Sequence, residues 1–349
     1  MTRTQQSTSA KPIDKTNACI PMTIRIMDNH LDNVIRDVPF EKLQEYLINP
    51  SHTWIDILCV TDSDFGRLSE LLNIPKPILE SGLSDESYPR IDYFEHFAMV
   101  FAKIANTTKL DEHSIQRFLI DRSGILVICQ GQNIVTLSKT HTDIFDLLLS
   151  RAKKIHSAEE PLVVSVLYTV FKYVLEKDQE IISAVEQELL TLEGIPIRNR
   201  PSNFLETAFY FRREINRMVP SLLHLKEIIS MIITKRVPLE GFSERHEKLF
   251  DILMDESVYL HETAADLRDN LQSMVDLYIN TSSYQMNRVM RVIAILTALG
   301  IVPAIVLGAF GTNITGSPWN FHLWQVLLGV GILMALMGWV FYKLGWFRG

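Results

Sequence analysis

Acidic side chains are absent from residues 292–349, where only two Lys or Arg residues occur. Two apolar runs lie within this stretch, at residues 292–310 and 323–342. Each is close to the roughly 20 residues that an α-helix needs to cross a hydrocarbon layer. Residues 311–322 form a short polar turn between them. The sequence therefore predicts a transmembrane hairpin at the end of a large soluble region, an order that excludes most enzymes.

Cysteine is scarce, and the three residues Cys19, Cys59 and Cys129 show no Cys-x-x-Cys or Cys/His spacing. They fit buried thiols in a reducing compartment and do not indicate a structural zinc site. The sequence also lacks a Walker Gly-x4-Gly-Lys-Ser/Thr motif, and it contains no HExxH, Gly-x-Ser-x-Gly or Gly-x-Gly-x-x-Gly. We therefore expect no enzymatic activity, no bound cofactor and no use of ATP.

The first residues are rich in Thr, Ser, Gln and Lys and lack the apolar core of a secretory signal. We expect residues 1–20 to form a disordered tail and the chain before the hairpin to stay in the cytoplasm. Cationic residues flank the two spans on one side (Arg288, Arg291, Lys343 and Arg348), whereas the turn between the spans has none. The positive-inside rule then predicts cytoplasmic termini, in an inner or plasma membrane, with residues 343–349 as a cytoplasmic tail.

Residues 21–140 indicate a cytoplasmic α/β domain, because β-rich apolar runs alternate with helical spacing. The predicted strands are residues 54–60, 97–102, 116–120, 125–129 and 133–137. The predicted helices are residues 62–72 and 76–82. Residues 141–242 are expected to be helical, with helices over residues 143–155, 161–192 and 201–235.

Residues 243–310 predict one very long helix, because Pro303 is their only proline and no glycine precedes Gly300. At 1.5 Å per residue this helix is roughly 100 Å long, and only its last third can lie in a bilayer. We divide it into a stalk at residues 243–291 and a first transmembrane helix at residues 292–310. A helix of this length needs partners, which favours an oligomer with parallel stalks.

One face of this helix changes from polar to apolar along its length. In steps of three to five residues, its members are Asp276, Asn280, Ser283, Asn287, Met290, Ile293, Thr297, Ile301, Ala304 and Gly308. A seam that only packed helices together would be apolar throughout, so the pattern favours a water-filled pore with a hydrophobic constriction. The alternative is that the polar members form an ordinary solvated face of a surface helix.

Three segments of the long helix and its end form a recognisable pattern: Leu-Gln-Ser-Met-Val-Asp-Leu-Tyr at residues 271–278, Asn-Arg-Val-Met-Arg-Val at residues 287–292, and Gly-Ala-Phe-Gly-Thr-Asn at residues 308–313. Together they resemble the CorA family of divalent-cation transporters. Tyr-Pro-Arg-Ile-Asp-Tyr-Phe at residues 88–94 is similar to a segment of the family's cytoplasmic domain. The resemblance implies an α/β cytoplasmic domain, long stalk helices and a two-helix transmembrane hairpin, assembled as a funnel-shaped homopentamer around one axial pore. The other implied partners are membrane lipid and divalent metal ions, with no nucleic acid.

The resemblance also assigns roles to individual residues. Gly311, Thr312 and Asn313 fall on the family's Gly-Met-Asn signature, so Asn313 would ring the outer pore mouth as the selectivity filter. Asp276, Asn287 and Met290 match pore-lining residues. The family's hydrophobic gate positions fall on Ile293 and Ile301.

Three departures from the family's pattern affect the expected function. Thr312 stands where the family has Met. The outer loop, Ile-Thr-Gly-Ser-Pro-Trp at residues 314–319, lacks an acidic residue and resembles the loops of ZntB-type zinc transporters. Finally, the family's regulatory Asp aligns with Ile252, so a regulatory metal site would shift to the flanking Asp251 and Asp255 or be absent.

We therefore predict a homopentameric channel or transporter that carries Mg²⁺ into the cytoplasm, with Co²⁺ or Ni²⁺ as further cargo. The alternative within transport is a ZntB-like Zn²⁺ transporter, with or without proton coupling. The alternative from another class is a membrane-anchored oligomeric scaffold or sensor without transport. Two residues also have non-transport interpretations: Asn313 as a helix C-terminal residue, and His322 as an interfacial residue beside Trp319 and Trp324.

Overall fold

The computed structural model divides the chain into two compact units, one of Met1–Ile195 and Arg200–Leu271 and the other of Pro196–Asn199 and Gln272–Gly349. The residues that it describes are 22–28, 34–48, 53–84, 88–94, 97–109, 118–131, 133–140, 145–147, 149–150, 161–195, 204–311 and 322–346. The predicted tail at residues 1–20 lies outside the described residues, as does most of the helix predicted at residues 143–155.

The first unit is built on a seven-stranded mixed sheet with the strand order β2-β1-β3-β7-β6-β5-β4. The strands are β1 (Thr23–Asp28), β2 (Val34–Arg36), β3 (Thr53–Leu58), β4 (Arg90–Tyr93), β5 (Ala98–Lys109), β6 (Phe118–Gln130) and β7 (Asn133–Ser138). Among the described pairs only β3 and β7 run parallel, and the others are antiparallel. This arrangement confirms the predicted α/β class.

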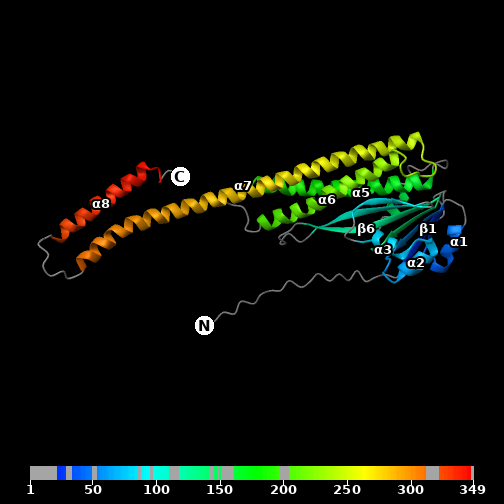
Figure 1. The fold of residues 1–349 in the computed structure, drawn as a ribbon, viewed down its shortest axis with the longest axis horizontal. Helices are drawn as coiled ribbons and strands as arrows, with labels where there is room; N and C mark the ends of the chain where they lie inside the picture. The colour runs from blue at the N-terminus through cyan, green and yellow to red at the C-terminus, as the bar shows by residue number, and fades with distance from the viewer. Residues whose placement is uncertain are drawn as a thin grey trace. The chain divides into compact units, whose positions relative to one another are not determined.

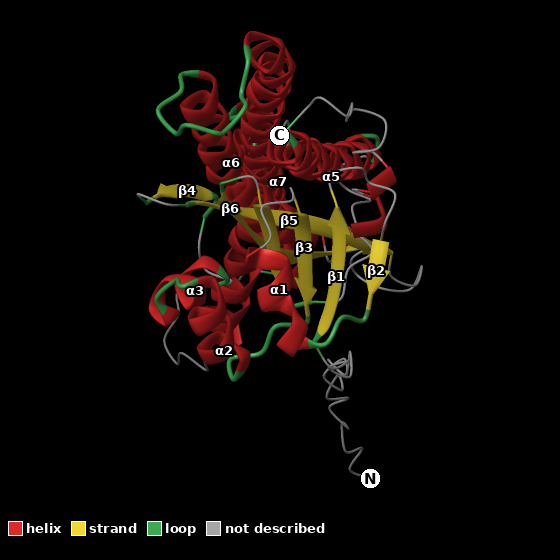
Figure 2. Cartoon of the chain, turned by 90° about the vertical axis from the view of Figure 1, so that its right-hand side faces the viewer, coloured by secondary structure: helices red, strands yellow, loops and turns green. Residues whose placement is uncertain are grey.

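Helices cover both faces of the sheet, as Figures 1 and 2 show. On one side lie the short 3₁₀-helix η1 (Phe40–Lys42) and the helices α1 (Leu43–Ile48), α2 (Asp64–Leu72) and α3 (Lys76–Gly82). On the other side lie α5 (Leu162–Glu193), α6 (Phe204–Ile233) and the first part of α7 (Glu244–Gly311). The last helix, α8 (Leu323–Lys343), belongs to the second unit with the rest of α7.

Apolar spacing explains how the short helices attach to the sheet. In α2, Phe65, Leu68 and Leu72 recur at helical spacing and are all buried. They pack in one core with alternate residues of the strands, such as Ile55 and Ile57 of β3. The opposite face of the sheet packs mainly against α5, whose first three turns are almost entirely buried. The sheet is therefore buried on both faces.

The predicted helices at residues 62–72, 76–82, 161–192, 201–235 and 243–310 are confirmed as α2, α3, α5, α6 and α7, with ends that differ by a few residues. The prediction of two separate strands at residues 116–120 and 125–129 was wrong, because β6 runs through both and pairs with β5 along its whole length. Gly124, which falls between the two predicted strands, lies within the ladder opposite Lys103. A Cβ built there would be 2.8 Å from the Phe101 ring, so the glycine makes room for that ring.

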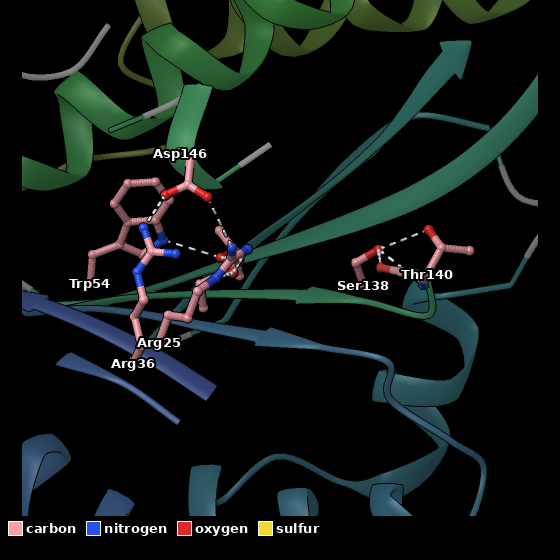
Figure 3. Close-up of polar contacts among 8 residues, drawn as sticks. Arg25, Arg36, Trp54, Ser138, Thr140 and Asp146 are labelled. Carbon is pink, nitrogen blue, oxygen red and sulfur yellow. Dashed lines mark hydrogen bonds and ion pairs between the residues drawn. The ribbon is translucent and has the colours of Figure 1, made fainter. Parts of the chain in front are cut away.

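A buried ion pair joins the neighbouring strands β1 and β3 (Figure 3). Arg25 of β1 lies directly opposite Asp56 of β3 in the antiparallel register, and their side chains meet at 2.7 Å. Asp56 also accepts a hydrogen bond from the Thr136 hydroxyl, and the Arg25 guanidinium lies 4.4 Å from the centre of the Phe145 ring. These contacts offset part of the cost of burying the two charges, but burial still raises the pKa of Asp56.

A second cluster of charged residues lies between β6 of the sheet and the helices α5 and α6. Arg122 of β6 donates to the backbone carbonyl of Glu214 in α6 at 3.2 Å and lies 3.8 Å from the Glu214 carboxylate. Asp178 of α5 is 6% exposed, and burial raises its pKa to about 7 against the opposing attraction of Arg122. Asp178 is therefore partly protonated near neutral pH.

The pKa of Asp178 gives a prediction for stability. A carboxyl group with a raised pKa in the folded state binds more protons when folded, so its effect on stability becomes less favourable as pH rises from about 4 to above 7. Asp178→Asn removes the buried charge. We expect this variant to unfold several degrees higher than wild type at pH 8 and at nearly the same temperature at pH 5.

Circular-dichroism melts of the purified protein at the two pH values provide the measurement. Glu186→Gln in the same helix is the matched control, because that side chain is exposed. An Asp178→Asn variant that melts below wild type at pH 8 would contradict the assignment.

Candidate functional site

The predicted pore-lining residues all lie on α7 within the second unit, between Asp276 and Gly308. Every member of this face is exposed in the single chain. From residue 282 to residue 290 the other sides of the helix are exposed as well, so exposure alone does not distinguish the face there. Residues 282–290 of α7 therefore have no packing partner among the described residues.

The apolar part of the face is exposed to an unusual degree for large side chains. Met290, Ile293 and Ile301 are 58%, 51% and 50% exposed. Leaving such side chains in water is unfavourable, which indicates that lipid or another copy of the chain covers them. The predicted constriction residues thus lie on one exposed face of α7.

Small or backbone-bonded residues separate the large apolar ones. The Thr297 hydroxyl donates to the Ile293 carbonyl at 2.8 Å, which satisfies its polar group within the helix. A Cβ built on Gly300 or Gly308 would meet nothing within 4 Å. Pro303 lies inside α7 and has no N–H to donate to the carbonyl of residue 299. This segment can therefore approach a neighbouring helix closely and bend.

At the N-terminal end of the face, Asp276 accepts a hydrogen bond from Gln272, one helical turn earlier. The Nε2–Oδ1 distance is 2.9 Å. Sequence reasoning included Asp276 and overlooked Gln272. The i, i+4 spacing of a Gln and an Asp was the signal that could have found the pair.

The signature residues lie at the end of the described helix. Gly311 is the last residue of α7, whereas Thr312 and Asn313 lie outside the described residues. His322 precedes α8, and its backbone N–H donates to Gln325 Oε1 at 3.0 Å, so it acts as the helix N-cap residue. The assignment of Asn313 as a filter remains a prediction.

The residues proposed for a regulatory metal site, Asp251 and Asp255, are exposed on α7 in the first unit. Ile252 between them is 57% exposed. Within the described part of the chain, no three His, Cys, Asp or Glu side chains come together to hold a metal ion. A metal at this place would therefore need ligands beyond the described residues of this chain, for example from a second chain.

Two of the described helices are long and apolar enough to cross a membrane, by length and composition. One is Glu244–Val306 within α7, and the other is Trp324–Lys343 within α8. Large apolar side chains of α8 are exposed, including Trp324, Leu328 and Ile332. The Lys343 ammonium lies 5.2 Å from the centre of the Trp339 ring, a pairing typical of residues at a membrane interface.

Comparison with known proteins supports the same interpretation. A cobalt/magnesium transport protein CorA of Methanocaldococcus jannaschii is 22% identical over 298 residues, which cover 84% of this chain and 90% of that protein. The complete structure of the CorA magnesium transporter from the same organism superposes with a TM-score of 0.71 at 19% identity, covering 93% of this chain and 98% of that one.

The cytoplasmic domain of ZntB from Vibrio parahaemolyticus also shares the fold, with a TM-score of 0.56 at 12% identity over 76% of this chain and all of that domain. At this identity the likeness concerns the fold alone. The match to a family is broader, because residues 49–343 match the family described as CorA-like Mg²⁺ transporter protein. The chain therefore belongs to the CorA-like Mg²⁺ transporter family.

Proposed function

We propose that the protein is a homopentameric channel that carries Mg²⁺ across the inner or plasma membrane into the cytoplasm. The observation that carries the proposal is the unpartnered face of α7, which changes from polar at Asp276 to apolar at Ile293 and Ile301. Five such faces around an axis would enclose a pore with a hydrophobic constriction. Membership of the CorA-like family supports the same conclusion.

The proposed orientation follows from the charges beside the two spans. Arg288 and Arg291 precede the apolar part of α7, and Lys343 ends α8. The residues that join the helices contain no Lys or Arg. Cationic flanks favour the cytoplasmic side, so the proposal places both termini in the cytoplasm and Asn313 at the outer mouth.

The chemistry of the proposed pore suits a strongly hydrated ion. Mg²⁺ loses water reluctantly, and neutral carboxamide oxygens such as those of Asn313 and Asn287 accept hydrogen bonds from its bound waters without holding the metal tightly. The membrane potential supplies the driving force. A divalent cation that crosses 100 mV, negative inside, gains roughly 4.6 kcal/mol.

Mg²⁺ is the first candidate because the family is described by that ion. The related protein of Methanocaldococcus jannaschii carries the name cobalt/magnesium transport protein, which supports Co²⁺ as further cargo. The specific observation that favours Zn²⁺ instead is the outer loop with Gly316, Ser317 and Pro318, which resembles that of ZntB-type transporters. A scaffold or sensor without transport would show no ion flux at all.

The filter assignment predicts a large effect of Asn313→Ala on transport. Removing the carboxamide takes away the acceptors for the hydrated ion, and we expect Mg²⁺ uptake into proteoliposomes to fall about tenfold or more. Assembly and thermal stability should hardly change. Asn313→Asp should also slow uptake, because added carboxylates bind the ion more tightly. Uptake of Mg²⁺ and Zn²⁺ by Asn313→Ala at the wild-type rate would show that the filter lies elsewhere.

Measuring Mg²⁺ and Zn²⁺ uptake in parallel, with and without a proton gradient, distinguishes the two transport alternatives.

The constriction predicts a leak when it becomes polar. Ile293→Ser should keep the narrow ring wet and raise basal Mg²⁺ flux several-fold, since apolar rings close pores by excluding water. Leu328→Ser in α8 is the matched control, because that side chain is exposed on the other helix. Unchanged flux in a correctly assembled Ile293→Ser variant would exclude this gate.

The mass of the assembly tests the proposed number of subunits. We expect native mass spectrometry of the detergent-purified protein to give five times the 40.0 kDa mass of the chain. A cyclic assembly places identical α7 faces around one axis, so any other stoichiometry would change the width of the pore. A monomer or dimer that still transports Mg²⁺ would overturn the axial-pore arrangement.

A further inference from the structure

Gln272 and Asp276 form the one side-chain hydrogen bond that the described structure gives to a charged residue of the proposed pore face. The Gln272 amide donates through Nε2 to Asp276 Oδ1 at 2.9 Å. Asp276 forms no ion pair among the described residues. Among the described residues, the Gln272 amide is therefore the side-chain partner of this exposed carboxylate.

The other end of the same carboxamide is left without a partner. Gln272 Oε1 is fully buried, and in the described part of the chain it accepts no hydrogen bond. Buried polar atoms without partners are rare in folded proteins because they lose their hydrogen bonds to water. Turning the carboxamide over would not help, since its oxygen would then face the Asp276 carboxylate and its amide would be the buried group.

The side chain thus keeps an unfavourable environment for its oxygen while it donates to Asp276. Position 272 could hold an apolar residue if its only role were to pack. Asp276 begins the polar part of the proposed pore face, at its cytoplasmic end. A carboxylate with one oxygen fixed by an amide presents its second oxygen in a defined direction.

We propose that Gln272 is a positioning residue, which holds the Asp276 carboxylate so that its free oxygen meets the hydrated divalent cation at the cytoplasmic end of the pore. This proposal rests on the proposed function, because it takes the 276–308 face as the pore lining. In a pentamer, five fixed carboxylates would form one ring. The ring attracts cations and, through bound water, releases them into the cytoplasm.

The test uses Gln272→Leu in the full-length protein, reconstituted in proteoliposomes. Leu has no donor for Asp276 and removes the unpaired oxygen. We expect initial Mg²⁺ uptake to fall about threefold or more while the unfolding temperature stays the same or rises. A merely structural residue would lose stability and uptake together.

Two further variants make the test specific. In an Asp276→Ala background, Gln272→Leu should cause no additional loss of uptake, because the group that it positions is gone. Asn270→Leu makes the same type of change at an exposed residue of α7 off the proposed face, and it should leave uptake unchanged. Wild-type uptake by Gln272→Leu, or an equal loss with and without Asp276, would overturn the positioning role and leave the proposed function standing. Absence of Mg²⁺ uptake by the wild-type protein would overturn both.

Discussion

The constraint on which the second unit depends is that a bilayer offers no hydrogen bonds to a polypeptide backbone. Each amide and carbonyl group in the hydrocarbon must find its partner within the protein, so a helix is the simplest spanning element. The α7 helix meets this requirement over Glu244–Gly311 with one interruption, at Pro303. In the same helix, the side chains of residues 282–290 are exposed, as are most of the large apolar ones beyond them, although Ile295 is buried. A helix that satisfies its own backbone thus still needs lipid or a protein partner to cover its apolar side chains.

The first unit is subject to a different constraint, because charged side chains are buried in a sheet that is covered on both faces. Arg25 and Asp56 compensate one another across two strands, and Thr136 and Phe145 complete their surroundings. Burial raises the pKa of Asp178 to about 7 against the attraction of Arg122, and it also raises the pKa of Asp56 against the attraction of Arg25. Removing one member of a paired buried cluster costs more than removing the whole cluster, so these residues constrain the fold jointly.

The proposed transport chemistry depends on weak interactions, since an ion that binds tightly cannot leave. Carboxamides and hydroxyls line the polar part of the α7 face, and Asp276 is its only carboxylate. Gln272 engages that carboxylate and leaves its own oxygen unpaired. A site that combines one fixed charge with neutral groups attracts a divalent ion without trapping it.

The pattern of residues along the chain was sufficient to predict those elements whose structure depends on residues close in sequence. The long helix followed from the lack of glycine and proline, the two candidate spans from continuous hydropathy, and α2 and α3 from apolar spacing. The same pattern was insufficient for elements whose structure depends on contacts with residues far apart in the sequence. The strands β1, β2 and β4 were not identified. The strand β6 was predicted as two strands, at residues 116–120 and 125–129, whereas pairing with β5 keeps it continuous. From the sequence alone an arginine such as Arg25 is expected at the surface, whereas in the fold Asp56 of β3 lies opposite it and the pair is buried.

The sequence by itself determined the order of the soluble region, stalk and hairpin. Only the tertiary structure decided which polar groups are buried, since burial and pairing depend on contacts between segments far apart in the chain.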